Sequence, residues 1–130
     1  MQCHCDSMLN FDLCCGSILQ GSRTAPTALS LMRSRYSAHV EQNVSYILET
    51  YGQKQKKLLS RQQIQQGLQQ TQWQELEILR VVQGKENDEY GEVEFLAHYL
   101  HQGNALTLHE HSYFQKEDGL WKYIGRIEEK

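Results

Sequence analysis

The spacing of apolar residues is helical in the part of the chain that follows its only proline, Pro26. Thr27 can accept a hydrogen bond from the first turn, so we expect it to be the N-cap of a helix. The apolar side of this helix comprises Leu29, Met32, Arg33, Tyr36 and Val40. Arg33 is the only charged residue of this set. Arg35 lies on the other side. We therefore expect both sides to be covered, one by a sheet and the other by the N-terminal segment.

Two shorter helices are predicted further along the chain. The first spans residues 44–51, with Asn43 as its cap and Gly52 as its end. The second spans residues 61–68, where Ser60 and Gln63 form a capping box. Apolar residues interrupt the surrounding glutamine-rich tract regularly, which favours a solvated helix over a low-complexity segment.

After residue 72 the pattern changes to the alternation that is typical of strands. Four strands are predicted, over residues 73–82, 90–100, 105–114 and 120–127. In the first of them, the alternation does not show which side chains face inward. Gly103-Asn104 and Asp118-Gly119 supply tight turns, so neighbouring strands are antiparallel. Three helices followed by a bent antiparallel sheet define an α+β fold with the helices on one face.

Composition restricts the possible functions. The chain has 130 residues, of which 39% are hydrophobic, and a net charge of −3. That balance is a poor one for binding nucleic acid, so no direct DNA binding is expected. No apolar run approaches the roughly 18 residues that a membrane span requires. The polar start of the chain lacks the apolar region of a signal peptide, so we expect a cytoplasmic protein with no membrane contact.

Four cysteines lie within the first fifteen residues, as Cys3, Cys5, Cys14 and Cys15, and the chain has no others. Two disulfides, four ordinary buried thiols and a metal site are the competing interpretations. Disulfides are rare in the cytosol, and the polar surroundings do not explain four buried thiols. Four thiolates in a short segment are a standard set for structural Zn²⁺, which is the interpretation we favour over an iron–sulfur cluster.

The spacing of these cysteines resembles the SEC-C motif, a zinc-binding element named for the C-terminal tail of the SecA translocation ATPase. The resemblance rests on Cys3-x-Cys5-x-Ser7, Phe11 and Cys14-Cys15-Gly16. It implies a zinc knuckle over residues 1–22 that uses the four cysteines as ligands. The small, polar residues 16–25 are interpreted as a linker.

The remainder of the chain is very similar to the YchJ family. The similar segments are ALSLMRSRYSAHV, WQELEIL, VEFLAHY, LHEHSYF and DGLWKYIG, in that order. Members of the family pair a SEC-C motif with a domain of the nuclear-transport-factor-two-like (cystatin-like) fold. The resemblance implies such a domain over residues 23–130, with helices packed on a curved sheet that forms a cone. It implies little about chemistry.

Glu110 is the unusual residue of the second domain, because strand alternation turns its carboxylate inward with Leu108 and Ser112. A buried carboxylate needs a partner or must stay protonated. Arg33 is the first candidate for the partner and Arg35 the second. One interpretation is a structural ion pair between helix and sheet. The other is an acid–base group in a pocket.

Aromatic residues are expected to line the same interior, either as core or as the wall of a ligand cavity. They are Tyr36, Phe95, Tyr99, Phe114, Trp121 and Tyr123. If the cavity binds a small molecule, we expect Tyr99 or Trp121 to contact it. His98, His109 and His111 are interpreted as half-exposed strand residues rather than as a second metal site.

These observations predict a zinc-binding adaptor rather than an enzyme. By resemblance, the SEC-C motif docks on a protein or ribosomal partner, and the basic run of Lys54, Lys56, Lys57 and Arg61 assists. The alternative is a small-molecule-binding protein or enzyme that uses Glu110 as acid or base. A homodimer through the outer face of the sheet is a further expectation.

Overall fold

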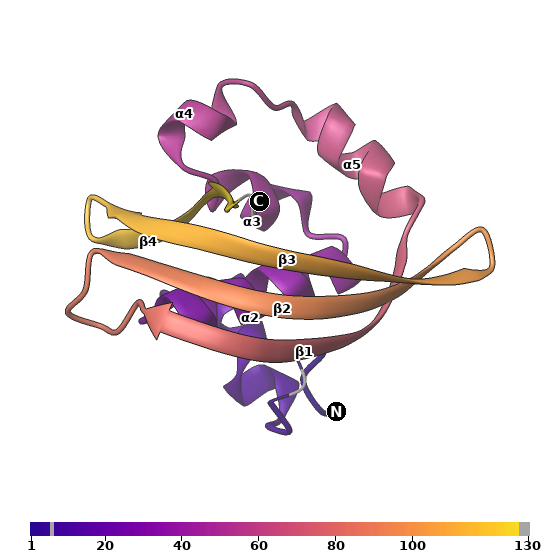
Figure 1. The fold of residues 1–130 in the computed structure, drawn as a ribbon, viewed down its shortest axis with the longest axis horizontal. Coiled ribbons are helices and arrows are strands. Elements are labelled where there is room, and N and C mark those ends of the chain that lie inside the picture. The colour runs from indigo at the N-terminus through magenta and orange to yellow at the C-terminus, as the bar shows by residue number, and fades with distance from the viewer. Residues whose placement is uncertain (6, 128–130) are drawn as a thin grey trace.

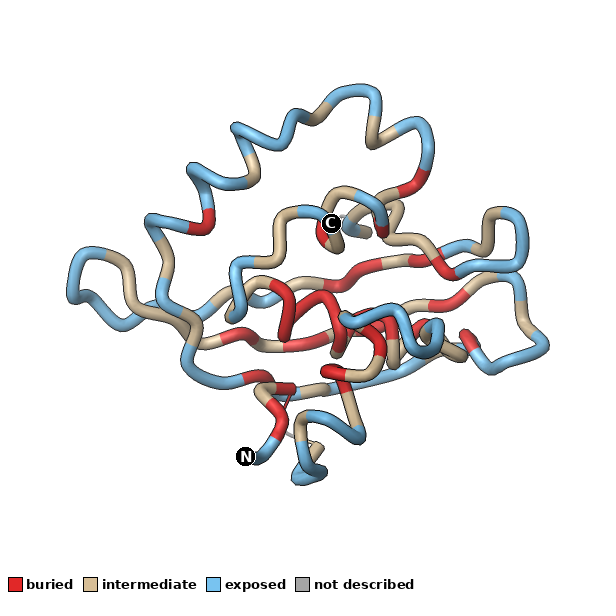
Figure 2. The backbone as a smooth tube through the Cα atoms, turned by 180° about the vertical axis from the view of Figure 1, so that it is seen from behind, coloured by how far each residue is buried: buried red, intermediate tan, exposed pale blue. Residues whose placement is uncertain are grey.

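A computed structural model describes residues 1–5 and 7–127 of the chain. Its four strands form one antiparallel sheet in the order β1-β2-β3-β4. The longest helix, α2, packs against one face of this sheet, so that the sheet lies in front of it in Figure 1 and behind it in Figure 2. The predicted α+β class, with helices on one side of a curved antiparallel sheet, is confirmed.

The described residues form six helical segments followed by four strands. The helical segments are η1 (Phe11–Leu13), α1 (Cys15–Leu19), α2 (Ala28–Val40), α3 (Val44–Glu49), α4 (Gln53–Lys56) and α5 (Arg61–Gln69). The strands are β1 (Gln72–Gln83), β2 (Tyr90–His101), β3 (Asn104–Glu117) and β4 (Leu120–Arg126).

The predicted helix starts are confirmed by their caps. The side chain of Thr27 accepts a hydrogen bond from the amide of Ser30, and α2 begins there. Ser60 and Gln63 form the reciprocal capping box at the start of α5. Local hydrogen bonding of this kind depends on residues three positions apart, which is why the sequence predicts it well.

Strand β1 contributes to the curvature of the sheet, because its register against β2 shifts twice. The shifts lie between Trp73 and Glu75 and between Ile78 and Arg80. A bulge of this kind bends the strand and increases its twist. It also disturbs the alternation of side chains, which explains the ambiguous phase of this segment in the sequence.

One hydrophobic core joins α2, the sheet and the cysteine tip, as we call residues 1–5 and 7–19. Its buried members are Cys3, Cys5, Cys15, Ala28, Leu31, Met32, Tyr36, Leu76, Val93, Phe95, Ala97, Phe114 and Trp121. Three cysteines of the tip are therefore part of the same core as the sheet. The boundary between residues 1–22 and 23–130 as separate domains stays a prediction.

The start of α2 is fixed against the β1–β2 hairpin by two glycines. The amide of Ala28 donates to the carbonyl oxygen of Gly84 at 2.9 Å. A Cβ on Gly91 would lie only 2.5 Å from the Cα of Gly84 and 2.9 Å from the Cβ of Ala28. The backbones can approach this closely only because both positions lack a side chain.

Two expectations about the N-terminal half are wrong. Residues 16–25 are not simply a linker, because α1 occupies part of this segment and buries Cys15 and Ile18. In α2, Arg33, the first candidate to meet Glu110 in the sheet, faces the cysteine tip instead, whereas Arg35 lines the cavity together with Glu110. The reason is that α2 buries residues on both sides, so apolar spacing alone does not identify the side that meets the sheet.

Among the described residues, no helix has the length and apolar character needed to cross a membrane.

Candidate metal centre and interior cavity

The cysteine tip is folded by its own backbone. The amide of Cys3 donates to the carbonyl oxygen of Leu9 at 2.8 Å, and the amide of Phe11 donates to that of Met1 at 2.8 Å. This loop returns Cys14 and Cys15 to the first pair of cysteines. All four Sγ atoms lie within 4.8 Å of one another. The structure thus brings together the four residues that the sequence singled out as metal ligands.

The sulfur geometry fits a tetrahedral thiolate site. With Zn–S bonds of about 2.3 Å, the sulfurs of such a site are about 3.8 Å apart. Cys5 Sγ and Cys14 Sγ lie 3.6 Å apart, and all four thiols are free. A separation of 3.6 Å is far longer than the S–S bond of a disulfide, about 2.0 Å.

Polar groups of α2 surround the cluster. Arg33 Nη1 donates to the carbonyl oxygen of Cys5 at 2.9 Å and lies 3.7 Å from Cys5 Sγ. Ser37 Oγ lies 3.6 Å from Cys3 Sγ. Donors of this kind stabilise the negative charge of metal-bound thiolates and orient them.

Further contacts anchor the tip from its other sides. Ser7 Oγ lies 3.2 Å from Cys14 Sγ, and Arg23 Nη2 donates to the carbonyl oxygen of Cys14 at 3.2 Å. His4 Nε2 lies 2.7 Å from a carboxylate oxygen of Glu41, just beyond the end of α2. Sequence reasoning missed Ser37, Arg23 and Glu41, because nothing in their local sequence indicates a contact with a cysteine.

Without a metal ion, one thiolate is stabilised by the other groups of the cluster. The pKa of Cys5 falls from 9.0 to about 4, mainly through the hydrogen bond from Cys15 and then through Ser7, Arg33 and Cys3, against the opposing effect of burial. The hydrogen bond to Cys5 raises the pKa of Cys15, and burial raises that of Cys14. The site holds one negative charge readily, and a divalent cation would displace the remaining protons.

Arg33 and Arg35 were the expected partners of Glu110, but Glu110 pairs with neither of them. Its carboxylate accepts hydrogen bonds from the hydroxyls of Ser112 and of Tyr123, the latter at 2.9 Å, and forms an ion pair with Arg126 Nη2 at 3.2 Å. Arg126 comes from the adjacent strand β4, so the pair lies within the sheet rather than between helix and sheet. Strand pairing, which alternation alone does not reveal, decides the partner.

Arg35 is buried, and its partners are neutral. Nη1 donates to the carbonyl oxygen of Ile47 at 2.9 Å and to the hydroxyl of Thr50 at 2.6 Å. The guanidinium carbon lies 4.4 Å from the ring centre of Tyr51 and 4.7 Å from that of Tyr123. Burial lowers the pKa of Arg35, although a guanidinium stays charged in proteins.

A cavity of about 160 Å³ lies between α2 and the sheet. It is lined by Met32, Arg35, Tyr36, His39, Tyr51, Trp73, Phe95, Ala97, Leu108, Glu110, Ser112 and Tyr123. Of the aromatic residues that the sequence singled out for the interior, Tyr36, Phe95 and Tyr123 lie in this lining beside Glu110.

The other three predicted lining residues lie elsewhere. Tyr99 packs on Trp73 with ring centres 5.2 Å apart, and Phe114 is fully buried in the core. The indole nitrogen of Trp121 donates to the carbonyl oxygen of Pro26 at 3.2 Å. Trp121 closes the interior near the start of α2, so neither Tyr99 nor Trp121 is placed to contact a molecule in the cavity.

His39 adds a neutral acceptor to the cavity lining. Its Nδ1 lies 2.7 Å from the carbonyl oxygen of Arg35 and must donate, because a carbonyl oxygen only accepts. Burial, together with the charge of Arg35, lowers the pKa of His39 from 6.5 to about 4. The ring is therefore neutral at pH 7, and its Nε2 is left as an acceptor.

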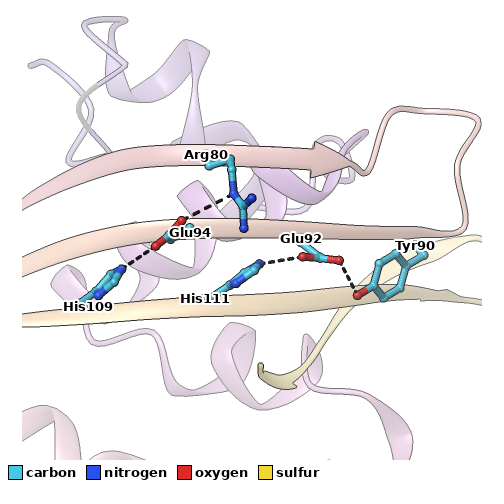
Figure 3. A network of polar contacts seen from close by, with 6 residues as sticks. All are labelled: Arg80, Tyr90, Glu92, Glu94, His109 and His111. Atoms are coloured by element: carbon cyan, nitrogen blue, oxygen red, sulfur yellow. Dashed lines mark hydrogen bonds and ion pairs between the residues drawn. The ribbon is translucent and has the colours of Figure 1, made fainter. Parts of the chain in front are cut away.

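The outer face of the sheet is polar and carries histidine–glutamate pairs between neighbouring strands. His109 lies 2.7 Å from Glu94, and His111 lies 2.7 Å from Glu92. Figure 3 shows both pairs, which Arg80 and Tyr90 extend through further contacts to Glu94 and Glu92. Each of these histidines has a carboxylate partner from the adjacent strand, and the cysteine cluster is the one converging ligand set among the described residues.

The fold and the site together define an α+β protein of the nuclear-transport-factor-two-like class that carries a four-cysteine motif. Residues 27–125 match the family model described as "YchJ, middle NTF2-like domain". The chain belongs to the YchJ family. A protein from Yersinia pestis described as a UPF0225 protein is 37% identical over 127 residues, which are 96% of this chain and 82% of the relative.

Two solved structures are similar over the whole chain. The solution structure of a SEC-C motif containing protein from Rhodopseudomonas palustris has a TM-score of 0.90 at 30% identity and covers 100% of both chains. The crystal structure of a SEC-C motif containing protein from Psychrobacter arcticus has a TM-score of 0.83 at 26% identity, over 100% of this chain and 85% of the other. The resemblance to SEC-C and YchJ proteins is confirmed.

Proposed function

We propose that this protein binds Zn²⁺ through Cys3, Cys5, Cys14 and Cys15 and uses the folded tip to dock on a partner protein in the cytoplasm. The observation that carries the proposal is the convergence of all four sulfurs within 4.8 Å. Soft thiolates in a tetrahedral set favour zinc over harder ions. Four free thiols packed so closely also fit a reducing compartment better than an oxidising one.

The surface of the tip supports a docking role. Its large exposed apolar side chains are Met1, Met8, Leu9 and Leu13. Leu13 is 77% exposed, although Phe11 in the same helical turn packs against the core. Apolar side chains gathered on a small, metal-ordered loop are suited to an apolar groove on another protein, whether free or part of a ribosome.

The basic run does not belong to this surface. Lys54 and Lys56 lie in α4, which is on the opposite side of the molecule from the N-terminal tip (Figure 1). A contact centred on the tip therefore leaves the basic run free. We accordingly propose recognition by apolar contact rather than by positive charge.

Metal analysis and affinity capture test the proposal together. Freshly purified, reductant-protected protein is expected to contain one zinc per chain, and Cys14→Ser with Cys15→Ser is expected to lose it. Leu13→Asp should keep the zinc but lose the captured partners. Leu58→Asp is the matched control, because Leu58 is 82% exposed but lies away from the tip, two residues beyond the end of α4.

Two results would contradict the proposal. Absence of stoichiometric metal would remove the zinc site. Partners that stay bound to both the double cysteine variant and Leu13→Asp would remove the docking role of the tip.

The alternative in which Glu110 acts as an acid or base is less well supported. Three donors already engage its two oxygens, from Ser112, Tyr123 and Arg126. A carboxylate held in this way fixes its donors, and proton transfer would first require breaking these bonds. We therefore propose a positioning role for Glu110 within the cavity wall.

A further inference from the structure

The cavity between α2 and the sheet contains charged groups that the proposed zinc function does not use. Its apolar lining includes Met32, Trp73, Phe95 and Leu108, whereas Arg35 supplies a buried cation. Because α2 separates the cavity from the cysteine cluster, the two sites can be tested independently.

The charges around the cavity do not cancel. Glu110 is neutralised by Arg126 at 3.2 Å. His39 is neutral at pH 7 because burial holds its pKa at about 4. Arg35 has no carboxylate within ion-pair distance among residues 1–5 and 7–127, and its observed partners are a carbonyl, a hydroxyl and two aromatic rings. Counting the described residues, the cavity therefore carries one positive charge without a counterion.

Because Arg35 is buried, its charge favours the binding of an anion. Arg35 is 6% exposed, and a buried cation without a counterion has lost hydration that neutral partners replace only in part. Both of its hydrogen bonds to Ile47 and Thr50 leave from Nη1, whereas a guanidinium has five N–H donors in a planar fork. The flanking rings of Tyr51 and Tyr123 hold that plane in place.

We propose that this cavity binds a small ring-bearing carboxylate, with the carboxylate on the guanidinium of Arg35 and the ring among the apolar side chains. A carboxylate matches the planar fork of arginine and can accept two of its N–H bonds. The volume of about 160 Å³ sets the size, since an apolar cavity of about 150 Å³ accommodates benzene. The ligand class that fits this space is a monocyclic organic acid.

Calorimetric titration of the full, zinc-loaded chain tests this inference with benzoate as the probe and benzamide as its neutral counterpart. Benzoate is expected to bind at one site, at least tenfold more tightly than benzamide. Ala97→Leu places a larger side chain in the cavity wall without changing any charge, so it should abolish the binding of both probes.

Variants of the two arginines separate charge from shape. Arg35→Lys keeps the charge but not the planar fork, so benzoate should bind at least tenfold more weakly. Arg126→Gln leaves Glu110 without its cation. It should weaken the binding of benzoate and leave the binding of benzamide unchanged. Should Arg35→Lys fail to fold in a melting experiment, Arg126→Gln and the two probes still decide the question.

The inference is overturned if benzoate does not bind to the wild-type protein. It is equally overturned if benzamide binds as tightly as benzoate, which would assign the cavity to neutral apolar ligands. Benzoate binding that survives Ala97→Leu would place the anion on the surface instead.

Discussion

Arg33 in the middle of α2 donates a hydrogen bond of 2.9 Å to the carbonyl oxygen of Cys5, 28 positions earlier in the chain. The opposite side of the same helix presents Arg35 and His39 to the cavity. One helix therefore supports both the metal centre and the interior of the sheet. The cysteine motif is consequently built into the fold rather than attached to it by a flexible linker.

Removal of zinc is expected to destabilise the whole protein. Cys3, Cys5 and Cys15 belong to the main hydrophobic core, so release of the metal should loosen that core as well as the tip. At free zinc about 1,000-fold above its dissociation constant, binding contributes about 4 kcal/mol to the free energy of unfolding. Thermal melts with and without a strong chelator measure this effect. Identical melting curves would show that the metal is not part of the fold.

Arg33→Gln is expected to weaken zinc binding about 10- to 100-fold, the usual effect of losing a group that orients a metal ligand. The reason is the loss of its contacts to the carbonyl oxygen and sulfur of Cys5. Competition with a chromophoric chelator measures the affinity. Arg80→Gln is the control, because Arg80 lies on the outer face of the sheet and contacts Glu94. Equal losses in both variants would argue against a specific role for Arg33.

Replacing glycine by alanine should lower the stability of the protein at one position and raise it at another. Gly91→Ala should lower stability, because its Cβ would lie 2.5 Å from the Cα of Gly84. Gly67→Ala should raise stability by about 0.5–1 kcal/mol, because Gly67 lies inside α5 with no atom within 4 Å of its Cβ. Denaturant unfolding measures both changes. A destabilised Gly67→Ala protein would contradict the assignment of α5.

His39 should make stability fall as the pH is lowered. Its pKa is about 4 in the folded protein and about 6.5 when unfolded, so the unfolded chain binds the additional proton. The contribution is fully present above pH 6.5, is lost as the pH falls toward 4, and amounts to at most about 3 kcal/mol.

Two measurements check the behaviour of His39. An NMR titration of its ring should give a midpoint near pH 4, with the proton on Nδ1 above that pH. In His39→Gln the slope of unfolding free energy between pH 7 and 5.5 should become shallower than in the wild type. A ring that titrates near 6.5 would show that the cavity is open to water at this position.

Some features of the fold could be predicted from the sequence because they depend on near neighbours. The capping box of Ser60 and Gln63 spans four residues. The hairpin between β3 and β4 depends on Asp118 and Gly119, whose φ angles are 52° and 78°. The set of four cysteines is likewise a local pattern, and its chemistry follows from the residue type.

Other features could not be predicted in this way. The partner of Glu110 is Arg126 because β3 and β4 pair in one particular register, with a shift next to Tyr113. The side of α2 that meets the sheet could not be identified because both sides are buried. The helix α1 is too short to show a periodic pattern, and its burial of Cys15 and Ile18 depends on contacts with the rest of the fold.

The sequence by itself thus determined the order of the three longest helices and of the four strands, the family resemblance and the thiol chemistry of the tip, since these follow from local conformational preference and residue type. Only the tertiary structure decided that Arg33 faces a cysteine while Arg35 lies beside a cavity with no carboxylate partner among the described residues. The physical reason is that the orientation of a helix with two buried sides is set by long-range packing, and packing also decides which charges find partners.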